Sequence, residues 1–112
     1  MKAFLAKIFA KYIVKKEQKW IDNPIETQDK ILKELIECAK NTQFGKDHQF
    51  DQINDYEDFK KLVPVNDYEG LKHYFNDVVE GKSDVLWPGK PLYLAKTSGT
   101  TSGTKYIPLT KE

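Results

Sequence analysis

The chain has 112 residues, of which 39% are hydrophobic and 31% are charged, with a net charge of +1. This composition fits one globular domain or part of one, and it gives no support for an intrinsically disordered chain. All eighteen basic residues are lysine, and the missing arginine forks argue against a nucleic-acid-binding protein. A single cysteine, Cys38, excludes an internal disulfide framework and favours a reducing compartment, so we expect a cytoplasmic protein.

Residues 3–20 predict an amphipathic helix, because apolar side chains recur at spacings of three and four residues. Lysines interrupt the apolar run, which excludes both a signal peptide and a membrane-spanning segment. We expect the apolar stripe to pack against the helices that follow, and the alternative is contact with a membrane surface. The residues expected to be buried are Leu5, Ile8, Phe9, Tyr12 and Ile13.

A second helix is predicted at 24–41. Asn23 is its expected cap, and Pro24 suits the first helical position, where its missing N–H is no loss. Cys38 falls on the predicted apolar side and is expected to be a buried thiol. That side comprises Ile31, Leu32, Leu35, Ile36 and Ala39.

Residues 42–52 predict a loop held by Phe44 and Phe50, and two shorter helices are predicted at 55–62 and 67–80. The expected caps are Asn54 or Asp55 for the helix 55–62, and a capping box of Asn66 with Glu69 for the helix 67–80, which Gly81 would end. Neither histidine, His48 or His73, has a ligand or base partner at helical spacing. We therefore name no catalytic residue and no metal ligand.

Two strands, expected at 92–97 and 104–109, flank a loop made only of Ser, Thr and Gly. Glycine allows close backbone approach, hydroxyls can donate to phosphate oxygens, and no carboxylate occurs between residues 85 and 111. The loop therefore predicts a phosphate site, and the alternative is an ordinary hairpin turn. The candidate binding residues are Ser98, Gly99, Thr100, Thr101, Ser102, Gly103 and Lys105. The spacing differs from that of a Walker A loop, because three residues separate the glycines and strand follows.

The stretch Thr97–Lys105 resembles the phosphate loop of adenylate-forming enzymes. Other motifs resemble the auxin-responsive acyl-acid amido synthetase family, and bacterial members look most similar. These motifs are Phe44–Lys46, Val63–Tyr68, Val85–Pro91 and Lys105–Thr110. Ser102, Gly103 and Thr104 stand where the wider superfamily has Gly, any residue and Pro, which weakens the reading as an acyl-CoA synthetase.

The resemblance implies an α/β fold in which residues 1–112 form the N-terminal part of an adenylation domain, with four helices followed by the loop-bearing hairpin. It also implies an ATP-dependent ligase that uses ATP and Mg²⁺, activates a carboxylic acid as an acyl-adenylate and passes the acyl group to an amine such as an amino acid. Two alternatives stay open: an acyl-CoA-forming ligase, and a non-catalytic helical interaction module. We expect this chain to be part of a longer enzyme and to be inactive alone.

Overall fold

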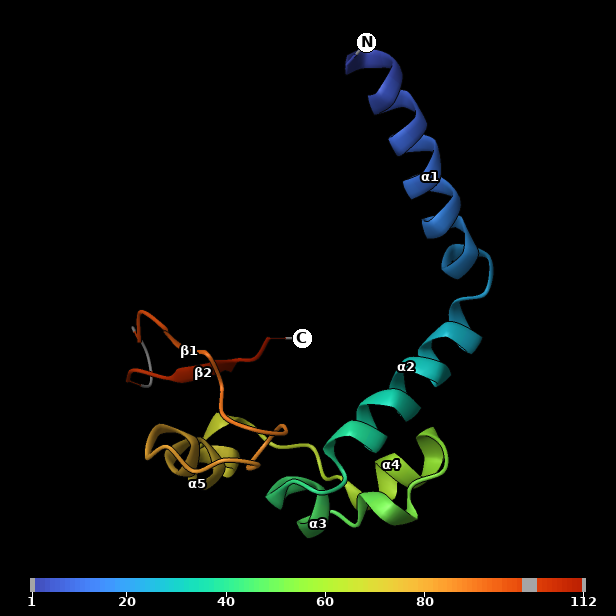
Figure 1. Cartoon of the computed structure of the whole chain (residues 1–112). Helices are drawn as coiled ribbons and strands as arrows, with labels where there is room; N and C mark the ends of the chain where they lie inside the picture. Colours follow the sequence, from blue (N-terminus) through green and yellow to red (C-terminus); the bar gives the residue numbers. More distant parts are fainter. Residues whose placement is uncertain (1, 100–102, 112) are drawn as a thin grey trace.

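The computed structural model describes residues 2–99 and 103–111, and it is helical as far as Val79 and ends in a two-stranded antiparallel sheet (Figure 1). Its elements are α1 (Lys2–Asp22), α2 (Pro24–Ala39), α3 (Gln43–Asp47), the 3-10 turn η1 (Phe50–Gln52), α4 (Tyr56–Leu62), α5 (Tyr68–Val79), β1 (Tyr93–Lys96) and β2 (Tyr106–Leu109). The four expected helices and the hairpin are all present. The loop expected at 42–52 is wrong in part, because α3 and η1 form there.

The helix α1 projects from the rest of the molecule (Figure 1). None of residues 2–22 is buried, so the expected packing against later helices is wrong for Leu5, Ile8, Phe9, Tyr12 and Ile13. The radius of gyration is 18.5 Å, whereas a compact chain of this length has about 13 Å. The apolar spacing in α1 therefore predicted the helix correctly, but it did not determine whether another helix would pack against it.

The chain turns between α1 and α2 at Asn23, with Pro24 at the first position of α2 as expected. The Asn23 side chain makes no capping bond, and its Nδ2 donates instead to the carbonyl of Lys19 at 3.3 Å. Later in α2, Ile36 and Ala39 are buried and define its inner side. Cys38 lies about 100° round the helix from Ala39 and is exposed, so the expected buried thiol is wrong.

Thr42 connects α2 to α3 and is 1% exposed. Its hydroxyl donates to the carbonyl of Ala39 at 2.7 Å and accepts the N–H of Gly45 at 3.0 Å, which caps α3. Gly45 is required here, because a Cβ would lie 2.2 Å from the Ala39 oxygen. The first core cluster forms around this turn from Ile36, Ala39, Phe50 and Ile53.

The helices α4 and α5 are each capped by an aspartate. Asp55 accepts the N–H of Asp58 at 3.0 Å, which is one of the two expected caps for α4. Asp67 accepts the N–H of Gly70 at 2.9 Å, so the expected capping box of Asn66 and Glu69 is wrong. Asn66 donates to the carbonyl of Pro64 instead. At the other end of α5, Gly81 has the expected left-handed conformation, with φ of 87°.

The segment between α5 and β1 holds the helices together. Its backbone accepts two hydrogen bonds from the start of α3, from Gln43 N to Asp84 O at 2.8 Å and from Phe44 N to Val85 O at 2.9 Å. Val85, Tyr74 and Val78 form the second core cluster, and Phe44 contacts both clusters. The hairpin then lies beside α5 (Figure 1).

Candidate functional site

The candidate site is the loop that joins β1 to β2. The strands pair antiparallel, with Tyr93 opposite Leu109 and Lys96 opposite Tyr106. The next pair, Thr97 and Lys105, closes the loop with two hydrogen bonds. Thr97 N donates to Lys105 O at 3.0 Å, and Lys105 N donates to the Thr97 hydroxyl at 3.2 Å. The loop therefore has a fixed base, and the expected hairpin is confirmed.

Two glycines sit at opposite ends of this loop, and both have left-handed backbone, with φ of 57° at Gly99 and 81° at Gly103. A Cβ on Gly99 would lie 2.7 Å from the carbonyl group of Gly103 and 2.9 Å from Thr104 N. Since those neighbours are backbone, no side chain can be accommodated by a rotamer change. At Gly103 the space is open, and only the backbone conformation favours glycine. The two ends of the loop thus meet at Gly99.

Tyr68, near the start of α5, holds the base of the loop. The backbone N–H of Tyr106 donates to its hydroxyl at 3.0 Å, and the Lys105 Nζ lies 5.3 Å from its ring centroid. Its ring also stacks on Phe75, with 4.6 Å between the centroids. The Lys105 ammonium therefore lies over the aromatic face of Tyr68, on α5. The motif Val63–Tyr68 contained this residue, but nothing in the sequence indicated its contact with a strand.

The structure brings four of the predicted site residues together at this end of the hairpin: Ser98, Gly99, Gly103 and Lys105. The other three, Thr100, Thr101 and Ser102, lie outside the described residues. The donor set suits an anion, since it consists of hydroxyls, backbone N–H groups and one ammonium, with no carboxylate in the surrounding sequence. The close approach at Gly99 is between the two ends of the loop itself, since a Cβ there would meet the backbone of Gly103 and Thr104.

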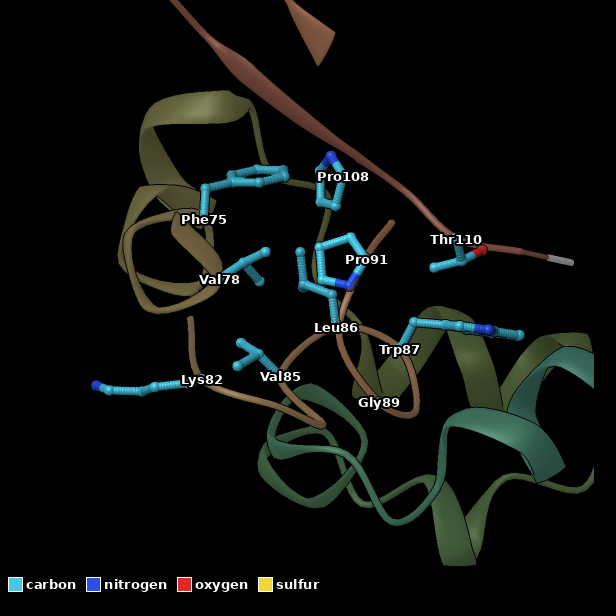
Figure 2. A pocket seen from close by; sticks show the side chains of 10 residues that line it. All are labelled: Phe75, Val78, Lys82, Val85, Leu86, Trp87, Gly89, Pro91, Pro108 and Thr110. Atoms are coloured by element: carbon cyan, nitrogen blue, oxygen red, sulfur yellow. The ribbon is translucent and has the colours of Figure 1, made fainter. Parts of the chain in front are cut away.

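An apolar cavity of about 220 Å³ lies elsewhere, between α5, the segment 82–91 and the far end of β2 (Figure 2). Phe75, Val78, Leu86, Trp87, Pro91 and Pro108 supply its apolar walls. Lys82 stands at its edge and is paired with Asp77 at 2.5 Å. This hydrogen bond raises the pKa of Lys82 and lowers the pKa of Asp77. The charged side chain in the cavity lining, Lys82, is therefore already paired.

Within residues 2–99 and 103–111, no three His, Cys, Asp or Glu side chains gather as a metal site. His48 hydrogen-bonds the carbonyl of Phe44 at 2.9 Å and stacks on the Phe44 ring, while His73 packs against Tyr74. Both histidines therefore contact neighbouring aromatic residues of the fold. In the same part of the chain, the helices are all too short or too polar to cross a membrane.

Comparison with known proteins identifies the family. Residues 14–112 match the sequence model described as the GH3 family N-terminal domain. The chain is 33% identical over 92 residues to indole-3-acetic acid-amido synthetase GH3.15 of Arabidopsis thaliana, covering 80% of this chain and 15% of that protein. It is 35% identical over 79 residues to 4-substituted benzoates-glutamate ligase GH3.12 of the same plant, covering 70% and 14%. No solved structure gives a significant match.

A third relative, jasmonoyl-L-amino acid synthetase JAR6 of Nicotiana attenuata, is 28% identical over 87 residues, covering 76% of this chain and 15% of that protein. The chain thus spans about 15% of the length of these relatives. Their names confirm the resemblance to acyl-acid amido synthetases that the motifs indicated. Since the family match runs from residue 14 to residue 112, this chain belongs to the GH3 family, where it corresponds to the N-terminal domain.

Proposed function

We propose that this chain supplies the ATP phosphate loop of a ligase that joins a carboxylic acid to an amine. The observation that carries the proposal is the pair of left-handed glycines, Gly99 and Gly103, in a loop free of carboxylates. Phosphate loops need this combination, because an oxyanion must approach backbone N–H groups closely and must meet no like charge. The names of the GH3 relatives, which are amido synthetases and a glutamate ligase, support the ligase chemistry.

In the proposed reaction, a carboxylate oxygen attacks the α-phosphorus of ATP, and the bond to the β-phosphate oxygen breaks to release pyrophosphate. An amine nitrogen then attacks the acyl carbon, loses its proton, and AMP leaves. The negative charge that develops on the phosphates needs donors that are fixed in advance. We assign this role to backbone N–H groups of the loop, to hydroxyls, and to the cationic Lys105. The hydroxyls are those of Ser98, Thr100, Thr101 and Ser102.

Mg²⁺ would enter this site with ATP. The part of the chain that the structure describes holds no cluster of carboxylates for the ion, so its ligands from this chain would be few. Mg²⁺ is commonly bound through substrate phosphates and water with one or two protein carboxylates. An acyl-CoA-forming ligase would use the same loop, with a thiol in place of the amine. The relatives' names favour the amide product.

The test is pyrophosphate exchange into ATP, driven by carboxylic acids, in the complete enzyme that contains this chain. Gly99→Val should abolish exchange through both a steric clash and backbone strain, and Gly103→Val should abolish it through the strain of a β-branched residue at a φ of 81°. Ser98→Ala should lower the rate by no more than about 10²- to 10³-fold, as for loss of one pre-organised donor.

Gly89→Val is the matched control, because Gly89 has φ of 76°, open space around it and no part in the loop. The variant carries a backbone strain similar to that of Gly103→Val, so a general effect of strained glycines would appear in it as well. We expect exchange to persist in Gly89→Val. Exchange at the wild-type rate in both loop glycine variants would refute the phosphate assignment.

A further inference from the structure

The helix α1 has an apolar face that no described part of the chain covers. Five of its large side chains are each between 52% and 68% exposed: Phe4, Leu5, Ile8, Phe9 and Tyr12. The helix contacts α2 where the two helices meet, and it extends away from the other helices and the hairpin (Figure 1). A contiguous apolar surface of this kind marks an interaction site.

The charged residues near the N-terminus are mostly positive. Residues 1–20 contain six lysines and one acid, Glu17, whereas the remaining residues hold twelve lysines and sixteen acids. Lys7, Lys11 and Lys15 follow one another at steps of four, so they form a basic row along one side of the helix. At 100° per residue, this row lies about 80° to 160° round the helix from Leu5 and Phe9, although Phe4 falls between Lys11 and Lys15. Lys16 and Lys19 lie on the side of Leu5 and Tyr12, so α1 is basic as a whole. The face therefore suits a partner that is both apolar and anionic.

We propose that α1 lies in the surface of an anionic phospholipid membrane. Its apolar face would enter the boundary between headgroups and acyl chains, and the lysine row would remain among the anionic headgroups. The acidic body would be repelled from the same surface, and the projection of α1 allows the body to stay clear of it. This proposal is independent of the ligase function.

Two other occupants fit the observations less well. A second copy of α1 would bring together two helices that each carry six lysines and only two acids, Glu17 and Asp22. The GH3 match begins at residue 14, so most of the apolar face precedes the part that the family shares. The shared domain therefore gives no reason to expect a family-wide partner for Leu5, Ile8 or Phe9.

The experiment is co-sedimentation of the 112-residue chain with vesicles of phosphatidylcholine alone and of phosphatidylcholine mixed with phosphatidylglycerol. We expect binding only to the anionic vesicles, and release at about 1 M salt, where the Debye length falls to about 3 Å. The triple variant Lys7→Gln/Lys11→Gln/Lys15→Gln should bind about 100-fold more weakly, since each lysine near the surface is worth about fivefold. Its control removes three lysines from the body, as Lys60→Gln/Lys61→Gln/Lys72→Gln, and should bind like the wild type.

The apolar face has its own matched pair of variants. Leu5→Gln/Phe9→Gln should abolish vesicle binding. Ile31→Gln/Leu35→Gln should not, although those residues lie on α2 at the same spacing and are 49% exposed each. Circular dichroism would check that both variants remain helical. Absence of wild-type binding, equal binding to neutral vesicles, or equal losses in the control variants would overturn the proposal. A dimer that dissociates in Leu5→Gln/Phe9→Gln, without any vesicle binding, would assign the face to a second copy instead.

Discussion

Tyr68 joins α5 to the hairpin through three contacts of different chemistry. Its ring stacks on Phe75, its hydroxyl accepts the N–H of Tyr106, and its face lies under the ammonium of Lys105. The first contact fixes the ring on α5, and the other two fix the start of β2 and the position of a cation. This one side chain therefore couples a helix to the base of the candidate phosphate loop.

Tyr68→Phe should weaken the attachment of β2 without displacing the ring. The variant keeps the stacking and the cation–π contact but leaves the Tyr106 N–H without its acceptor, a loss of about 1 kcal/mol. Hydrogen exchange of the Tyr106 amide should therefore speed up about fivefold, and Tyr68→Leu should speed it up further because the cation–π contact is lost as well. Tyr93→Phe, at a residue 73% exposed on β1, is the control and should leave this amide unchanged. Unaltered exchange in Tyr68→Leu would show that the contact does not hold the strand.

Tyr74 gives the second core cluster a dependence on alkaline pH. Burial raises the pKa of Tyr74 to about 12, and its hydrogen bond to the Asp47 carboxylate, at 2.7 Å, acts in the same direction. The unfolded chain ionises its tyrosines at about 10, so the folded state holds the proton more tightly. This contribution to stability is complete below about pH 10 and is lost as the pH rises towards 12.

Tyr74→Phe should therefore remove part of the alkaline loss of stability. Urea unfolding at a series of pH values should show a smaller fall in unfolding free energy between about pH 10 and 12 in the variant than in the wild type. The comparison is needed because the raised pKa of Lys82 adds its own loss in the same direction. If the two profiles were parallel throughout that window, Tyr74 would not be the group responsible.

At the scale of elements, the spacing of apolar residues predicted the helices correctly, but it did not predict which of them pack against another element. In α2 and α5, apolar residues at helical spacing are buried, as at Ile36 with Ala39 and at Tyr74 with Val78. The same kind of pattern in α1 stays exposed. Periodicity is a property of one segment, whereas burial requires a second surface that the pattern does not specify. The sequence therefore predicted α1 correctly as a helix and wrongly as part of the core.

For α3 the sequence predicted too little structure, because a helix forms where a loop was expected. It has only five residues, and its start is held by the backbone of the segment at Asp84 and Val85, far along the chain. Its local signal was Thr42, a good cap, but a single cap does not establish a helix this short. The loop glycines were predictable because their requirement is local. The contact of Tyr68 with β2 was not, because it joins elements that are separated by the whole of α5 and the segment that follows it.

Deletion of residues 2–13 should leave the unfolding free energy unchanged, because this part of α1 buries no side chain. Val78→Ala, which removes a side chain from the second core cluster, should by contrast cost about 1 to 3 kcal/mol. Urea denaturation followed by tryptophan fluorescence would measure both. A loss on deletion as large as that of Val78→Ala would mean that α1 packs on the body in solution.

At the scale of the whole molecule, the candidate phosphate loop is carried by a small two-stranded hairpin. The hairpin has two strands and rests on α5, and several of its side chains are exposed, including Leu92, Tyr93 and Leu109. Two-stranded sheets depend on such support for their stability. The described residues place one apolar cavity beside the far end of β2, away from Gly99 and Gly103. The candidate phosphate loop and the cavity therefore lie at opposite ends of the hairpin.

We predict that the 112-residue chain alone will not form an acyl-adenylate. Adenylation requires ATP, Mg²⁺ and a carboxylate to be held in line, and proximity of this kind is worth about 7 to 11 kcal/mol of barrier. The loop can supply phosphate contacts and one ammonium, but the described residues add no carboxylate cluster for the metal ion.

ATP should bind weakly to this chain, with a Kd near about 1 mM, which corresponds to about −4 kcal/mol. Gly99→Val should weaken even this binding in equilibrium dialysis, because it would distort the loop to which we assign the phosphate contacts. The decisive measurement is exchange of labelled pyrophosphate into ATP with a panel of carboxylic acids. Turnover above the no-enzyme control would show that residues 1–112 already bring the acid and the nucleotide into line, so that the remaining 85% or so of the relatives' length serves some purpose other than assembling the adenylation site.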